Sequence, residues 1–252
     1  MDTLKEAIEI LARENGINGK DIPVTFDAFR ALMNITDPRN LNEEYFRLQD
    51  GILKEELKKK KVTDVLTLPF DHGVALYQGD ITLLKADSIV NACNPSLLGC
   101  FIPLHHCIDN AIHSFAGLQV RRDLERIMER QSREEEPGKC KITEAYNLPC
   151  RYILHTVGPQ VHGKVKEKDR EDLRNCYRSC LDMAKEYQLV SIVFCSISTG
   201  IYGFPIEEAS RIALNTIFEY KKKVGIDIRI VFDVFSKKDF DIYKKNLEEY
   251  GE

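Results

Sequence analysis

The sequence lacks a long apolar run, since none of its hydrophobic stretches approaches the roughly 20 residues that a helix needs to cross a bilayer. Residues 1–6 show no basic and then apolar signal-peptide pattern and read as the start of a helix. Basic residues are not in excess either, because 36 Lys and Arg stand against 40 Asp and Glu, a net charge of −4. We therefore expect a soluble, cytoplasmic protein that binds neither membranes nor nucleic acid.

Cysteine is too sparse for a disulfide scaffold, because eight cysteines are spread over 252 residues. Cys176 and Cys180 are four residues apart in a helical pattern, and Cys195 lies in an apolar run, so we expect these three to be small core residues. Cys100 and Cys107 fit neither pattern and call for another explanation.

Two compositional regimes meet near residue 68. Residues 1–68 read as helices with polar connectors, because apolar residues recur there at helical spacing. The clearest stripes are Leu4, Ala7, Ile8 and Leu11, then Phe26, Phe29, Leu32 and Met33, and a weaker one of Tyr45, Leu48 and Ile52. This segment has too few apolar residues for an independent core, so we expect a helical extension that packs on the domain of residues 69–252.

The second regime alternates strand patterns with amphipathic helical patterns. Strands are expected at residues 74–77, 88–90, 152–157, 191–198 and 228–235, and helical patterns at 173–184, 206–217 and 240–247. Several of the strands are continuous apolar runs, which is typical of strands buried on both faces. The alternation predicts a three-layer α/β domain with a largely parallel sheet.

Three loops stand where such a sheet binds ligands, beyond the carboxyl ends of its strands. They cover residues 79–82, 91–95 and 198–203. The last loop places small residues near a helix start, which fits an anion site, although plain turn chemistry is the more frequent reason for such residues. Neither a P-loop nor a dinucleotide fingerprint occurs. The sequence therefore lacks the motifs that usually indicate ATP hydrolysis or hydride transfer.

Several segments, in this order, resemble those of a macrodomain. They include Gln78-Gly79-Asp80-Ile81-Thr82, Ile89-Val90-Asn91-Ala92-Cys93-Asn94 and Ser198-Thr199-Gly200-Ile201-Tyr202-Gly203, with residues 108–113, 116–117, 142–149, 152–159 and 231–235. The resemblance runs from about residue 70 to the last helical pattern and leaves the N-terminal extension outside. It implies an α/β/α sandwich with a mixed, largely parallel sheet that binds ADP-ribose.

The resemblance also implies roles for single residues. Asp80 would accept a hydrogen bond from the adenine amino group, with the Ile81 backbone beside it, and Phe235 would stack on the adenine. The loop that would hold the diphosphate and contact the distal ribose consists of Ser198, Thr199, Gly200, Ile201 and Tyr202. From the residues alone, Asp80 reads equally as a turn residue and Phe235 as a core residue.

The reactive end of the ligand is assigned in the same way. Asn94 would bind the distal ribose, and Asp109, at a helix start, would act as a base or position a water. Asn91 is grouped with the substrate-binding residues, although a strand-end Asx-turn is its simpler interpretation.

The chain departs from ordinary macrodomains in the turn of residues 99–107, which is longer and carries two cysteines and two histidines. Thiolate and imidazole are ligands that Zn²⁺ prefers, and three protein ligands with an open fourth position are typical of a catalytic zinc. On the residues alone, a metal site and a chance gathering both stay open. The turn, however, resembles that of the zinc-dependent macrodomain subgroup. This implies one Zn²⁺ held by Cys100, His105 and Cys107, with His106 as an exposed neighbour.

The subgroup is linked to sirtuin-type ADP-ribosyltransferases and lipoyl-carrier proteins. The resemblance therefore implies a zinc-dependent hydrolase that removes mono-ADP-ribose from Asp or Glu side chains, with a lipoyl-carrier protein among the candidate substrates. Two alternatives remain, a non-catalytic ADP-ribose reader with a structural zinc and a hydrolase of small derivatives such as O-acetyl-ADP-ribose. The N-terminal helices would cap the sheet or dock a protein partner.

Overall fold

The computed structural model describes residues 2–250. Packing divides the chain into two compact units. The first, here called the helical unit, comprises Met1–Lys61, Ser96–Glu134 and Glu144–Leu148. The second, here called the sheet unit, comprises Val62–Pro95, Glu135–Thr143 and Pro149–Glu252. The division predicted at residue 68 follows sequence pattern rather than packing, and it stays a prediction.

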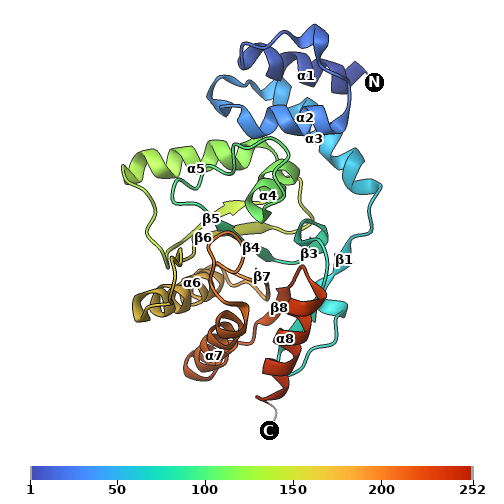
Figure 1. Ribbon diagram of the computed structural model, residues 1–252. Helices are drawn as coiled ribbons and strands as arrows, with labels where there is room; N and C mark the ends of the chain where they lie inside the picture. The colour runs from blue at the N-terminus through green and yellow to red at the C-terminus, as the bar shows by residue number, and fades with distance from the viewer. Residues whose placement is uncertain (1, 251–252) are drawn as a thin grey trace. The chain divides into compact units, whose positions relative to one another are not determined.

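The described residues of the helical unit form five α-helices. They are α1 (Asp2–Glu14), α2 (Phe26–Ile35), α3 (Glu43–Lys58), α4 (Ile108–Ala116) and α5 (Leu118–Gln131), as Figure 1 labels them. Side-chain caps define where two of them begin, since Thr25 accepts a hydrogen bond from the Ala28 amide and Asn42 accepts one from the Tyr45 amide. The three expected N-terminal helices are confirmed, whereas no apolar stripe had indicated α5.

The helical unit is built around a core shared by α1, α2 and α3. Its buried members are Ala7, Ile8, Leu11, Ala12, Phe29, Leu32, Met33, Leu41, Tyr45, Phe46, Ile52, Leu53 and, from α5, Leu118. The N-terminal helices therefore have more of a core than their composition suggested. The expectation that they pack on the following chain is confirmed, because α2 contacts α4 and Leu118 joins their core.

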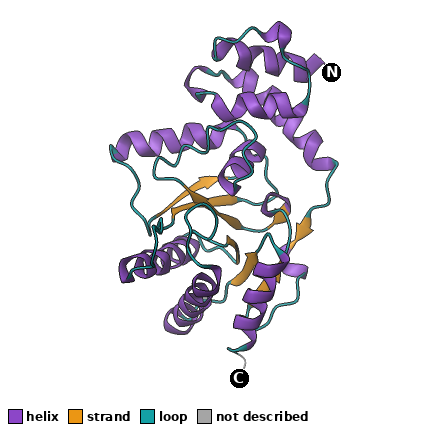
Figure 2. Ribbon diagram, in the orientation of Figure 1, coloured by secondary structure: helices purple, strands orange, loops and turns teal. Residues whose placement is uncertain are grey.

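The sheet unit is organised on a six-stranded sheet with the order β2-β8-β7-β4-β6-β5. Figure 2 draws the strands in orange. The strands are β2 (Val74–Tyr77), β4 (Ser88–Cys93), β5 (Cys140–Glu144), β6 (Tyr152–Val157), β7 (Ser191–Cys195) and β8 (Arg229–Asp233). The pairs β2–β8, β8–β7, β7–β4 and β4–β6 are all parallel. All five expected strands are present, but β4 continues to Cys93, β7 and β8 end earlier than expected, at Cys195 and Asp233, and β5 was missed.

The remaining elements of the sheet unit are short strands and helices. A two-stranded parallel sheet pairs β1 (Thr63–Asp64) with β3 (Leu84–Lys85). The helices α6 (Glu167–Glu186), α7 (Ile206–Val224) and α8 (Lys237–Glu248) lie side by side (Figure 1). Cys176 and Cys180 of α6 and Cys195 of β7 are buried, as expected of core residues.

One loop is less exposed than its composition indicated. The stretch of residues 131–138 reads as an exposed loop, yet the side chain of Glu135 is buried. Its carboxylate pairs with the Lys141 ammonium, Oε2 to Nζ 2.9 Å, which offsets the desolvation of the charge. Within residues 2–250, no helix is both long and apolar enough to span a membrane.

Candidate functional site

The loop after β2 presents a carboxylate that is fixed by its own turn. Asp80 caps a short 3-10 helix (Ile81–Leu83), and its Oδ1 accepts hydrogen bonds from the Thr82 amide (2.9 Å) and the Thr82 hydroxyl (2.6 Å). Asp80 is exposed whereas Ile81 is buried. The turn interpretation is confirmed, and the ligand interpretation stays a prediction with which the exposure of Asp80 is compatible.

A second carboxyl group supports this loop from the neighbouring strand. Asp233 ends β8, which pairs with β2, and Tyr77 lies opposite it in register. Burial raises the pKa of Asp233 to about 7; a hydrogen bond from the Gly79 amide opposes the shift, and the charge of nearby Asp80 adds to it. Asp233 therefore holds the backbone of Gly79, directly before Asp80, through this hydrogen bond. No sequence pattern had indicated this role.

Asp233→Asn is expected to stabilise the protein at high pH. Between pH 4 and pH 7 the folded Asp233 keeps a proton that the unfolded chain releases, so its burial lowers the free energy of unfolding as the pH rises through this window. Asparagine retains an acceptor for Gly79 without the charge. The free energy of unfolding of the variant should exceed that of the parent protein by roughly 2–4 kcal/mol at pH 8 and by close to nothing at pH 4. Urea unfolding at the two pH values measures the difference. An equal gain at both pH values would contradict this account.

The loop after β7 combines an exposed apolar residue at its tip with an unusual backbone. Ser198 has φ = +66°, a conformation that L-residues seldom adopt and that recurs at functional sites. The loop is closed by hydrogen bonds from Phe204 N to Ser198 O and from Gly203 N to Gly200 O, each 3.0 Å. Ile201 is 75% exposed at its tip. A folded loop that holds its backbone fixed and its tip open suits a ligand-binding role.

Gly158, which follows β6, allows the chain to pass close to this loop. A Cβ at position 158 would lie 2.0 Å from Ser198 Oγ and 2.8 Å from Ile197 Cγ2. Any larger residue would therefore push the loop of residues 198–203 out of place. The sequence had shown this glycine only as part of a motif, and its steric role needed the structure.

Phe235 lies just beyond β8 and is 91% exposed, which excludes the core interpretation. Its backbone carbonyl accepts a hydrogen bond from Gln78 Nε2 at 3.3 Å, so the residue adjoins the loop that carries Asp80. An exposed aromatic residue that adjoins the loop of an exposed carboxylate is compatible with the predicted adenine position.

The two asparagines of β4 and its following loop differ in environment. Asn91 was expected after the strand, but it lies inside β4 and is fully buried. Its Nδ2 is 3.3 Å from His155 Nδ1, and His155 Nε2 is 2.9 Å from Thr143 Oγ1. His155 is thus a hydrogen-bonded core histidine, and burial lowers its pKa to about 3. Asn94 follows the strand and is half-buried, which leaves it better placed than Asn91 for contact with a ligand.

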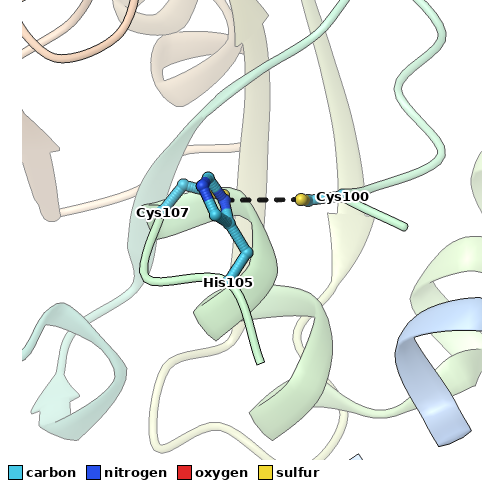
Figure 3. A group of neighbouring side chains, drawn as sticks. All are labelled: Cys100, His105 and Cys107. Atoms are coloured by element: carbon cyan, nitrogen blue, oxygen red, sulfur yellow. Dashed lines mark hydrogen bonds between the residues drawn. The ribbon is translucent and has the colours of Figure 1, made fainter. Parts of the chain in front are cut away.

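The structure gathers Cys100, His105 and Cys107 into one group (Figure 3). One ligand atom from each residue lies within 4.8 Å of the others, and Cys100 Sγ is 3.5 Å from His105 Nδ1. His106 is exposed and is not part of this group. The three side chains come from the connection before α4 and point toward one another.

The donor set of this group fits a soft divalent metal ion. Burial raises the pKa of Cys107 to about 11, and the neighbouring Cys100 adds to the shift because two adjacent thiolates repel. A bound cation would remove this penalty, since thiolates and imidazole are preferred zinc ligands. The Cys107 thiol also caps α4 by accepting a hydrogen bond from Asn110 N at 3.4 Å.

Asp109 lies in the first turn of α4, two residues after Cys107. It is buried, and its Oδ1 is 3.4 Å from His113 Nε2 one helical turn later. The helix N-terminus favours a negative charge here. His113 is itself buried, on the inner side of α4. The helical unit thus carries the group of Cys100, His105 and Cys107 together with Asp109, and the sheet unit carries the other predicted site residues.

Comparison with known proteins identifies the class. Residues 90–213 match the Macro domain family. The chain is 44% identical, over 94% of its length, to a protein-ADP-ribose hydrolase of Treponema medium, of which it covers 95%. It is 43% identical to the human ADP-ribose glycohydrolase MACROD2 over 78% of its own length and 46% of that protein. The chain belongs to the macrodomain family.

A solved relative supports the same conclusion. The Oceanobacillus iheyensis macrodomain with ADP matches with a TM-score of 0.64 at 38% identity, covering 70% of this chain and 90% of that one. The expected α/β macrodomain fold with a mostly parallel sheet is thereby confirmed. The zinc-dependent subgroup stays a prediction.

Proposed function

We propose that this macrodomain is a hydrolase that releases ADP-ribose from modified proteins. The relatives support the activity, because the Treponema medium protein is named protein-ADP-ribose hydrolase and the human one ADP-ribose glycohydrolase. The observation that carries the finer proposal is the group of Cys100, His105 and Cys107, which lies two residues before the buried carboxylate of Asp109. A protein that only reads ADP-ribose has no need of that combination.

We propose that Cys100, His105 and Cys107 hold one Zn²⁺ ion. Two thiolates and one imidazole match its ligand preference, although other thiophilic metals suit the same donors. When bound, the ion would supply Lewis acidity for a ribose hydroxyl or a water. His105 rather than His106 is supported as the ligand, because His105 Nδ1 already lies beside Cys100 Sγ.

The remaining site residues bind and orient the substrate in this proposal. Asp80 accepts a hydrogen bond from the adenine amino group, Phe235 stacks on the ring, and the loop of residues 198–202 holds the diphosphate. These contacts supply binding energy remote from the reacting bond. Asn94 orients the distal ribose, and Asp109 positions a water or accepts its proton as a general base.

The substrate proposal is an ester between the distal ribose and a protein Asp or Glu side chain, with a lipoyl-carrier protein among the candidates. A carboxylate ester already contains a good leaving group, so the site needs to orient a nucleophile and stabilise developing charge. Hydrolysis of small derivatives such as O-acetyl-ADP-ribose presents the same ribose end and is the nearest alternative.

The proposal is tested by the rate of ADP-ribose release from an Asp/Glu-modified protein, measured beside the rate on O-acetyl-ADP-ribose. We expect release from both, with the higher kcat/KM on the modified protein. Faster turnover of the small ester would favour the alternative substrate. Tight binding of ADP-ribose in a calorimetric titration, with no turnover of either substrate by the metal-loaded protein, would make the chain a reader.

A further inference from the structure

The metal-bearing loop of residues 99–107 has little internal structure to hold it. It contains no helix or strand, and its sequence places the exposed apolar residues Phe101 and Ile102 between the ligands. Leu104, directly before His105, has φ = +54°, which is unfavourable for a residue with a Cβ. Because this conformation is strained, contacts from outside the loop must maintain it.

One such contact comes from α2, seventy positions earlier in the chain. Asn34 is buried, and its Oδ1 accepts a hydrogen bond from the Leu104 amide at 2.9 Å. Its Nδ2 donates to Ser114 Oγ of α4, also at 2.9 Å. The side chain of Asn34 therefore links Leu104, the strained residue of the loop, to α4, the helix that follows the loop.

The network continues from α4 to the backbone of the loop. Ser114 Oγ donates to Asn110 Oδ1 at 3.3 Å, and Asn110 Nδ2 donates to the carbonyls of Cys100 (3.4 Å) and Ile102 (3.0 Å). Asn34 is thus bonded directly to Leu104, the neighbour of His105, and is linked through Ser114 and Asn110 to the carbonyl group of Cys100.

A buried cation ties the same helix to the start of the loop. Arg121 of α5 is almost fully buried and donates to Leu98 O at 2.8 Å. Its guanidinium also donates to Met33 O (3.0 Å), Asn34 O (3.0 Å) and Thr36 O (2.6 Å) at the C-terminal end of α2. The positive charge suits this helix end, where carbonyl groups lack partners within the helix.

We propose that α2 is a platform that sets the conformation of the loop of residues 99–107, with Asn34 as a positioning residue for the metal ligands. The inference assigns a role to the N-terminal helices, which lie outside the family match at residues 90–213. Its metal-binding consequence rests on the proposed zinc site. Groups that orient metal ligands without touching the ion typically change metal affinity tenfold to a hundredfold when they are removed.

The test is Asn34→Ala in the full-length protein, with two readouts. Hydrogen exchange at the Leu104 amide should accelerate at least tenfold, because this amide loses its acceptor. Zinc affinity, measured by competition with a chromogenic chelator, should fall about tenfold to a hundredfold. Ser114→Ala is the second variant, since it removes the link from Asn34 to Asn110 and should shift both readouts in the same direction.

The matched control is Leu32→Ala, which weakens the core of the same helix without a polar contact to the loop. It should lower the melting temperature while leaving zinc affinity and exchange at Leu104 close to those of the parent protein. Equal readouts in Asn34→Ala and the parent protein, or equal losses in Leu32→Ala and Asn34→Ala, would overturn the inference. A parent protein that does not bind zinc refutes the zinc site alone, since exchange at Leu104 still decides the positioning role.

Discussion

Replacing Cys107 with serine is expected to abolish zinc binding and to reduce ADP-ribose release at least a hundredfold, with the fold intact. Serine lacks the soft thiolate that zinc prefers, but it is a favourable helix N-cap and can accept the hydrogen bond from Asn110 N that Cys107 now accepts. The loss should therefore come from the metal rather than from α4. Metal content after dialysis, the release rate and the melting temperature of the apo proteins measure the three consequences.

Cys140→Ser serves as the matched control for this substitution. Cys140 is also half-buried, but it lies in β5 and is not among the gathered ligands. It should retain both metal and activity. Full turnover by metal-free Cys107→Ser would contradict the zinc mechanism, and loss of activity in both variants would point to a general sensitivity to cysteine replacement.

Gly158→Ala is expected to weaken ADP-ribose binding at least tenfold. The added methyl carbon would stand 2.0 Å from Ser198 Oγ, and rotation of that hydroxyl would still leave Ile197 Cγ2 at 2.8 Å. The loop of residues 198–203 therefore has to move, and the backbone groups proposed to hold the diphosphate move with it. Titration calorimetry with ADP-ribose measures the affinity, and zinc content should stay at the parent level.

The matched control is a Gly→Ala substitution at a position where the added methyl group meets no other atom. Gly51 lies within α3 with no atom within 4 Å of an added Cβ, so Gly51→Ala should leave ligand affinity unchanged and slightly favour the helix. Unchanged ADP-ribose affinity in Gly158→Ala would show that the loop tolerates displacement or does not hold the ligand.

The parallel sheet was predictable because its strands are continuous apolar runs. Residues 74–77 and 152–157 were placed to the residue, since both are buried segments bounded by turn signals. β5 escaped notice because Cys140–Glu144 is only partly buried and mixes polar with apolar residues. α5 escaped because its buried face includes Gln119 and Arg121, which a search for apolar stripes passes over.

The site loops could be predicted where several metal-ligating residue types stand close together in the sequence. Cys100, His105 and Cys107 stand within eight residues, so their types and spacing were enough to suggest a group. Asn91 was placed wrongly relative to its strand because an asparagine inside a buried strand is rare unless it is hydrogen-bonded, here to His155.

Long-range supports were beyond the sequence. The hydrogen bond between Asn34 and Leu104 joins residues that are 70 positions apart, and Arg121 reaches carbonyls 85 to 88 positions away. Neither has a local signature, since a buried arginine and an asparagine near a helix end each have many possible partners. The pKa of Asp233 likewise depends on burial that only the assembled strand pair creates.

The release assay with an Asp/Glu-modified protein, repeated after treatment with a strong chelator, tests the central claim most directly. We expect release to stop when the metal is removed and to return when Zn²⁺ is added back, while ADP-ribose binding by the sheet unit's residues persists in both states. Undiminished release from protein shown to be metal-free would contradict a zinc-dependent hydrolase.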